Sequence, residues 1–430
     1  MRKGRIQSVD HQEVGGVEQV VSIQLPLPLV MSLCDVEKSF FDLCVAAGRQ
    51  VLTVMMENDR TALCGPKWMP DSKRKAGRAG SVRSEVTLGG RRIPVQRLRA
   101  RSVCREELVL PSFAFAASRD PLNHRTLEAI AAGVSTRKYH RTLDPLPSVE
   151  TQRAVAKSSV SRRFVALSSK LLTEWIERPL HDLDLRVVMI DGILFRNHCI
   201  LIALGITAQG VKRVLGVREG STENTAVAKA LLSDLIDRGL PDDRALLFAI
   251  DGGKGIRKAI EQIFGKLALI QRCQVHKARN VKEHLPDSLR PGAQRALDDA
   301  YNTADAELAQ RQLERLARSL ERDHPGAAAS LREGLPETLT LQRLGVTGAL
   351  YKTLRTTNPI ENLNGSVGHF TKNVKRWKDG SMLVRWIVAA VHEAESHFRA
   401  LRGYKDMPIL VAALKRHEAT VKVDIKKRVA

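Results

Sequence analysis

The stretch between residues 181 and 277 most constrains how this chain can fold. Two apolar, β-branched runs in it, VVMIDG and LLFAIDG, each end in the dipeptide Asp-Gly, at Asp191 and at Asp251. A carboxylate at the end of a buried strand is costly to remove from water, so two such carboxylates indicate a common partner, and a shared cation is the commonest one. The alternative is that each Asp-Gly marks only a turn.

The order of apolar runs around the two aspartates predicts the fold class. RVVMIDGIL, HCILIALGI and KRVLGVREGS are expected to form an antiparallel meander, followed by a helix with Ser221 or Thr222 as its N-cap and Gly239 just past its end. The run RALLFAID, the helix KGIRKAIEQIF and the strand LALIQRC come next. This order predicts an α/β protein whose RNase H-like catalytic core is a mixed five-stranded sheet with helices. Adjacent parallel strands would then bring Asp191 and Asp251 together.

The remaining sequence predicts mainly helical segments around this core. Residues 1–105 are expected to form a helical arm with a basic hairpin or linker, including a helix over 36–59 and a hairpin around Gly89-Gly90. Residues 106–180 are predicted to be a helical, helix-turn-helix-like DNA-binding region, with a polar break near Lys157. The core would occupy 181–276 and 351–402, interrupted by an all-helical insertion over 277–350, and 403–430 would form a basic C-terminal tail.

The charge balance favours a polyanionic partner. Lys and Arg number 69 against 47 Asp and Glu, a net charge of +22, and nucleic acid is a better candidate for such a surplus than a membrane. No apolar run reaches the length of a membrane helix and the first residues lack a signal-peptide core, so we expect a cytoplasmic, nucleoid-associated protein. The basic segment over residues 64–103 fits a solvated linker as well as it fits contacts with a DNA backbone.

A site holding two cations needs a third carboxylate, and Glu361 in TTNPIENLNG is the first candidate. The competing interpretation is a capping box, with Asn358 as N-cap, Pro359 at the first helical position and the glutamate capping the chain. Glu393 and Glu395 are the reserve candidates.

Cys273 and His276 form a Cys-x-x-His pair directly after a predicted strand. Two ligands do not make a structural zinc site without two more, so a structural or DNA-positioning role is expected. The basic side chains around this pair would suit contacts with substrate phosphates. The DGGKG segment does not match the phosphate loop of nucleoside triphosphatases, because Phe248 stands where that motif requires glycine and no Ser or Thr follows Lys254.

Several of these motifs, in this order, resemble the Mutator-type transposases of bacterial insertion sequences. The resemblance covers roughly residues 80–400 and rests on IDG at 190–192, the block from VLGVREGSTEN through IDGGKG, QRCQVHKARNV at 271–281 and NPIENLNG at 358–365. It implies a DDE transposase in which Asp191, Asp251 and Glu361 hold two divalent cations, Mg²⁺ with Mn²⁺ as the alternative. The Cys-x-x-His signature of that family matches Cys273 and His276. The chain departs from the family pattern after the second aspartate, where many relatives have Ser-Asp-Ala-His and this sequence has Ile-Asp-Gly-Gly.

The implied activity is cleavage of DNA at the terminal inverted repeats, followed by transfer of the freed 3′-hydroxyl to target DNA. Double-stranded DNA is the expected partner, and joining two ends requires a homodimer or a higher oligomer on DNA. The alternatives are a catalytically inactive relative that acts as a transposition repressor and, with less support, a nuclease without transfer activity. The basic residues expected to contact DNA are Arg162, Arg163, Arg272, Lys277, Arg279, Lys372, Lys375 and Arg376.

Overall fold

The computed structural model describes residues 36–69, 76–88, 91–118, 124–131, 133–142, 156–220 and 222–429. It divides into two compact units, one made of Met1–Asn123 with His140–Ala156 and the other of His124–Tyr139 with Lys157–Ala430. The arm expected over residues 1–30 lies outside the described residues, as does most of the first helix of the expected helix-turn-helix.

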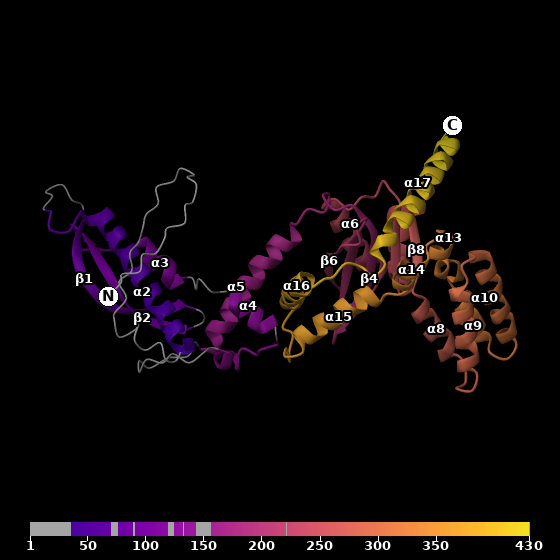
Figure 1. The fold of residues 1–430 in the computed structure, drawn as a ribbon, viewed down its shortest axis with the longest axis horizontal. Coiled ribbons are helices and arrows are strands. Elements are labelled where there is room, and N and C mark those ends of the chain that lie inside the picture. Colours follow the sequence, from indigo (N-terminus) through magenta and orange to yellow (C-terminus); the bar gives the residue numbers. More distant parts are fainter. Residues whose placement is uncertain are drawn as a thin grey trace, which may run out of the picture. The chain divides into compact units, whose positions relative to one another are not determined.

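The first unit packs a helix against a long hairpin. It contains α2 (Val36–Cys64), β1 (Ala76–Leu88), β2 (Arg91–Ser102), β3 (Glu107–Leu108) and α3 (Pro111–Ser118), drawn in indigo to purple in Figure 1. β1 and β2 pair in antiparallel register, with Val86 opposite Ile93, so the predicted hairpin is confirmed. It is longer than expected, and much of the basic segment interpreted as a possible linker is strand. Alternation explains this result, because Ile93 and Val95 are buried and the residues between and after them are exposed.

The second unit contains a mixed five-stranded sheet. Its strands are β4 (Leu185–Phe195), β5 (His198–Thr207), β6 (Lys212–Gly220), β7 (Leu246–Ile250) and β8 (Ala268–Arg272), in the order β6-β5-β4-β7-β8. β4, β5 and β6 form the predicted antiparallel meander, whereas β7 is parallel to β4 and to β8. The parallel strands are joined through helices α6 (Thr225–Asp237) and α7 (Lys254–Phe264).

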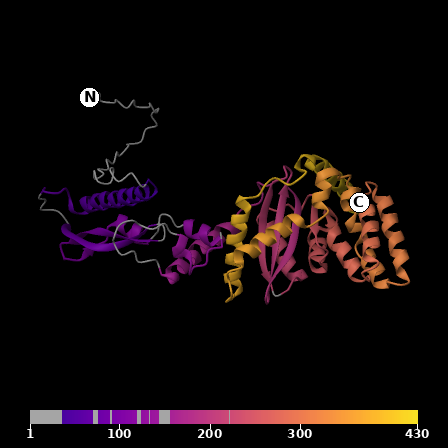
Figure 2. The same ribbon diagram turned by 60° about the horizontal axis from the view of Figure 1, so that its bottom comes forward.

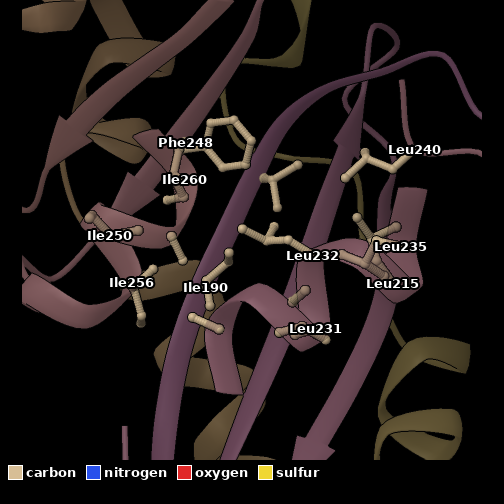
Figure 3. Close-up of a cluster of buried hydrophobic side chains, with 14 of the residues drawn as sticks. Ile190, Leu215, Leu231, Leu232, Leu235, Leu240, Phe248, Ile250, Ile256 and Ile260 are labelled. Carbon is tan, nitrogen blue, oxygen red and sulfur yellow. The ribbon is translucent and has the colours of Figure 1, made fainter. Parts of the chain in front are cut away.

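Both faces of this sheet are covered. On one face α6 and α7 pack Leu231, Leu232, Ile256 and Ile260 onto Ile190 and its neighbours, as Figure 3 shows. On the other face α15 (Asn358–Thr371) contacts β4, and α16 (Gly380–Ser396) contacts β6. Every residue of β7 is buried, which explains why its sequence is continuously apolar instead of alternating.

The helix after β6 begins later than the sequence analysis predicted. Its N-cap is Asn224, whose side chain accepts a hydrogen bond from the N–H of Val227, so the prediction of Ser221 or Thr222 is wrong. Asparagine caps as well as serine does, and it lies close enough to the first helical turn to accept this bond. The predicted end is confirmed, because Gly239 follows the helix with φ 106°.

Helices alone connect β8 to α15 within the described chain. They are α8 (Gln274–Glu283), α9 (Arg290–Asn302), α10 (Ala306–Glu321), α11 (Pro325–Arg332), α12 (Leu335–Thr338), α13 (Thr340–Arg343) and α14 (Gly348–Leu354). Residues from α8 to the end of α12 share a hydrophobic core of their own, which includes Leu297, Leu313 and Leu331. Figure 2 shows this block, salmon to orange, beside the sheet.

The remaining helices of the second unit are α4 (His124–Ala131), α5 (Lys157–Ile176) and α17 (Met407–Val429). α5 begins at the predicted polar break near Lys157 and continues for 20 residues. Among the helices described here, none combines the length and the apolar composition needed to cross a membrane.

Candidate active site

The two Asp-Gly dipeptides lie side by side at one edge of the sheet. Ile190 of β4 is the parallel partner of Ile250 of β7, so Asp191 and Asp251 are the next residues on adjacent strands that run in the same direction. Ile190 and Ile250 can be followed in Figure 3. Asp191 Oδ1 accepts a hydrogen bond from the N–H of Gly192 (3.0 Å), and Asp251 Oδ1 accepts one from Gly253 (2.8 Å).

The electrostatics show that these carboxyl groups are close to one another. Burial, repulsion from Asp251 and a smaller repulsion from Glu361 raise the pKa of Asp191 to about 6, although the N–H of Gly192 acts in the opposite direction. Among the described residues, neither aspartate forms an ion pair with a lysine or arginine. The imidazole of His276 is the basic group that offsets part of this repulsion at Asp191, in a chain whose net charge is +22.

Helix α15 brings the third predicted carboxylate to this edge. Asn364 on this helix donates from Nδ2 to Asp191 Oδ2 (2.7 Å), and Glu361 lies one turn earlier. The N-cap of α15 is Thr357, not Asn358, and its side chain bonds to the Glu361 carboxylate instead of to a backbone N–H. The capping-box interpretation is therefore wrong, because the glutamate lies one position beyond the place that such a box requires.

Glu361 also lies beside the Cys-x-x-His pair. One ligand atom each from Cys273, His276 and Glu361 falls within 4.8 Å of the others, and His276 Nδ1 is 3.8 Å from Glu361 Oε1. Burial acts to raise the pKa of the Cys273 thiol, but hydrogen bonds to His276 and Thr357 outweigh it, and the net pKa is lowered. The hydrogen bond to Cys273 raises the pKa of His276. Both shifts act toward the charged form of each group, and the pair lies at the start of α8 beside the glutamate.

The reserve candidates lie elsewhere in the second unit. Glu395 pairs with Arg178 (3.0 Å) and accepts a hydrogen bond from the N–H of Val214 (3.0 Å). Glu393 pairs with His397 (3.2 Å). Both glutamates lie on α16 and have partners of their own, so Glu361 is the predicted glutamate that lies near Asp191.

One carboxylate near the aspartates was missed by the sequence analysis. Burial, followed by repulsion from Asp251 and Asp191, raises the pKa of Glu223 to about 7. This residue lies just before α6, in the segment that was expected to cap the helix. Two signals could have indicated it: its position after a strand of the predicted core and its place within the block VLGVREGSTEN.

The predicted DNA contacts divide into surface and interior residues. Arg162, Arg279, Lys372, Lys375 and Arg376 are exposed, and Arg163 is half-buried. The structure instead turns Arg272 and Lys277 inward. The Arg272 guanidinium donates to the carbonyl oxygens of Glu333 and Gly252, and Lys277 is fully buried with Nζ bonded to the carbonyl oxygens of Ser330 (2.6 Å) and Glu333 (2.5 Å).

Comparison with known proteins identifies the family. The model of the Mutator family of transposases matches residues 32–400, which include both aspartates, Glu361 and the Cys-x-x-His pair. The chain belongs to the Mutator family of transposases.

Relatives of this Mutator-family chain include transposases of several bacterial insertion sequences. It is 29% identical over 218 residues to the transposase of element IST2 from Acidithiobacillus ferrooxidans, covering 50% of this chain and 72% of the relative. It is 31% identical over 205 residues to that of IS6120 from Mycolicibacterium smegmatis, covering 46% and 62%. It is 27% identical over 275 residues to that of IS256 in transposon Tn4001 from Staphylococcus aureus, covering 62% and 68%.

Proposed function

We propose that this Mutator-family protein is a DDE transposase that binds the terminal inverted repeats of its insertion sequence and catalyses DNA strand cleavage and strand transfer. The observation that carries the proposal is the convergence of Asp191, Asp251 and Glu361 from β4, the end of β7 and α15. The relatives named above are transposases of insertion sequence elements, in agreement with this activity.

The sheet supports an RNase H-like core. A three-stranded antiparallel meander whose first strand is extended by two parallel strands, in the order β6-β5-β4-β7-β8, is the arrangement expected for it. In this interpretation the helices from α8 to α14 are the insertion, since they connect the last strand to the helix that carries the glutamate.

The donor atoms at the site fit divalent cations of the Mg²⁺ class. Carboxylate oxygens are the ligands that Mg²⁺ prefers, and Mn²⁺ accepts them as well. Asp191, Asp251 and Glu361 would hold the cations, which, when bound, neutralise charge on the reacting phosphodiester and lower the pKa of water. The mutual repulsion of the carboxylates supports this fit, because a bound cation would relieve it.

Other residues of the chain orient the three carboxylates. Asn364 holds Asp191 in place, the backbone N–H of Gly253 fixes one oxygen of Asp251, and Thr357 fixes one oxygen of Glu361. The exposed cations on α5, on α8 and after α15 would bind the DNA backbone, where charge and not sequence is recognised. Since two transposon ends must meet, the working form would be at least a dimer on DNA.

A labelled duplex carrying the end of the element, incubated with the full chain and Mg²⁺, tests this proposal. Wild type should nick the duplex at the transposon end and join the 3′ end to target DNA. Asp191→Asn and Glu361→Gln should each lose about a hundredfold or more of this activity, whereas Glu393→Gln should retain it. Tight binding of the end without cleavage by the wild type would instead indicate a repressor.

A further inference from the structure

Glu223 occupies a loop that its neighbours hold in place. β6 ends at Gly220 and α6 begins at Thr225, and the side chain of Asn224 caps the helix by accepting from Val227 (3.0 Å). Asn224 also donates to Thr222 Oγ1 (3.0 Å). Asn224 therefore caps the helix and bonds across the loop to Thr222, and the carboxylate of Glu223 takes part in neither interaction.

The carboxylate of Glu223 points between the two catalytic strand ends. A Cβ added to Gly192 would lie 2.7 Å from Glu223 Oε2, and one added to Gly253 would overlap Glu223 Oε1 and approach Asp251 Oδ1 (3.4 Å). The glycines that follow the two aspartates thus leave the space that the Glu223 carboxylate fills. Because one oxygen of Glu223 lies against Gly192 and the other against Gly253, the carboxylate lies beside the backbone that follows Asp191 and Asp251.

Among the residues that the structure describes, none neutralises the Glu223 carboxylate. Within the described part of the chain, no N–H, hydroxyl, lysine or arginine contacts Glu223 within hydrogen-bond or ion-pair distance. A half-buried carboxylate beside two others is unfavourable unless a positive charge is added. The space that both glycines leave argues against an incidental position for this carboxylate.

We propose that Glu223 is a fourth carboxylate of the active site and ligates a divalent cation together with Asp251 and Asp191. The inference rests on the proposed function, since it concerns the same cations. It extends the set of three carboxylates, because Glu361 approaches from α15 and Glu223 approaches from the opposite side of the strand ends, in the loop before α6. Four carboxylates can share two cations without any one of them bridging both.

The test is direct binding of Mn²⁺ to the full chain without DNA, followed by the electron paramagnetic resonance signal of free Mn²⁺. Glu223→Gln should weaken binding at one site by about tenfold or more, and Glu223→Asp, which keeps the charge on a shorter side chain, should weaken it less. Asp237→Asn, an exposed carboxylate at the other end of α6, is the matched control and should bind Mn²⁺ as wild type does.

Thermal unfolding in EDTA shows whether a variant still folds. Because it removes one of four clustered carboxylates, Glu223→Gln should not have a lower Tm than wild type in EDTA, but Mn²⁺ should raise its Tm by less. Gly253→Ala should also weaken Mn²⁺ binding, because its methyl group displaces the Glu223 carboxylate.

The outcomes separate this inference from the function on which it rests. Unchanged Mn²⁺ binding by Glu223→Gln, together with weakened binding by Asp191→Asn, would overturn the role of Glu223 and leave the proposed function intact. Unchanged Mn²⁺ binding by both variants would contradict the proposed function as well.

Discussion

Asn364 donates a hydrogen bond to Asp191 over 2.7 Å although 173 residues separate them in the sequence. This contact joins α15 to β4, and Glu361 lies one turn earlier on the same helix, where its carboxylate repels that of Asp191. Of the helices between β8 and α15, α8 contributes His276 beside Glu361, and the connection as a whole determines where α15 lies.

Asn364→Ala should lower the rate of strand cleavage by about 10- to 100-fold, because residues that orient a metal-binding carboxylate have effects of this size. The assay is single-turnover cleavage of a labelled transposon-end duplex. Asn362→Ala removes an exposed asparagine from the same helix and should leave the rate unchanged. Equal rates for both variants would show that the hydrogen bond does not position Asp191.

Lys277→Met should destabilise the fold by about 1–3 kcal/mol, since the carbonyl oxygen of Ser330 loses its donor and that of Glu333 keeps only Arg272. Urea unfolding followed by circular dichroism measures this loss. Lys258→Met, at an exposed position on α7, should change stability by less than about 0.5 kcal/mol. A stable Lys277→Met protein that binds DNA poorly would instead support a direct contact with phosphate.

Lys375→Gln and Arg376→Gln should each weaken binding of any duplex and reduce the slope of log Kd against log salt concentration by about one. Both side chains are exposed just after α15. Fluorescence anisotropy over a salt series provides the measurement. Arg315→Gln removes an exposed cation from α10, and an equal loss of slope there would mean that the binding surface is not localised.

The raised pKa of Asp191 predicts how stability depends on pH when no divalent cation is present. The pKa is about 6 in the folded chain against a usual value of 3.8, so the folded state binds more protons between these two values. The free energy of unfolding should therefore fall as pH rises from about 4 to about 6, and remain lower above that range. Below about pH 4 the Asp191 carboxyl group is protonated in both the folded and the unfolded state, so it no longer lowers the free energy of unfolding.

Asp191→Asn should remove this part of the pH dependence. Relative to wild type in EDTA, the variant should gain about 1–2 kcal/mol between about pH 4 and about pH 7, a figure reduced for partial exposure to solvent. Comparing the two proteins at each pH cancels the contributions of other titrating groups. A difference that is constant with pH would show that Asp191 has an ordinary pKa.

The sequence was sufficient for the sheet and for the aspartates because both depend on local patterns. Continuous apolar runs predict buried parallel strands, and the ends of adjacent parallel strands meet at one edge, so the proximity of Asp191 and Asp251 followed from their positions alone. The hairpin of the first unit was equally readable from its alternation.

What the sequence could not supply depends on contacts between distant segments. The capping-box interpretation of Glu361 was wrong by one residue, a difference that only the conformation of Thr357 decides. The burial of Lys277 follows from the packing of α8 against α11, and the direction of Glu223 from a loop whose anchor is Asn224. Lys277 was expected at the surface, where most lysines lie, and Glu223 was not singled out.

An anomalous difference map of crystals grown with Mn²⁺ tests the central claim most directly. It should show a peak between the carboxylates of Asp191 and Asp251, with Glu361 within ligand distance of a cation. A map with no peak at these aspartates, or with its only peak at Cys273 and His276, would contradict the three-carboxylate site.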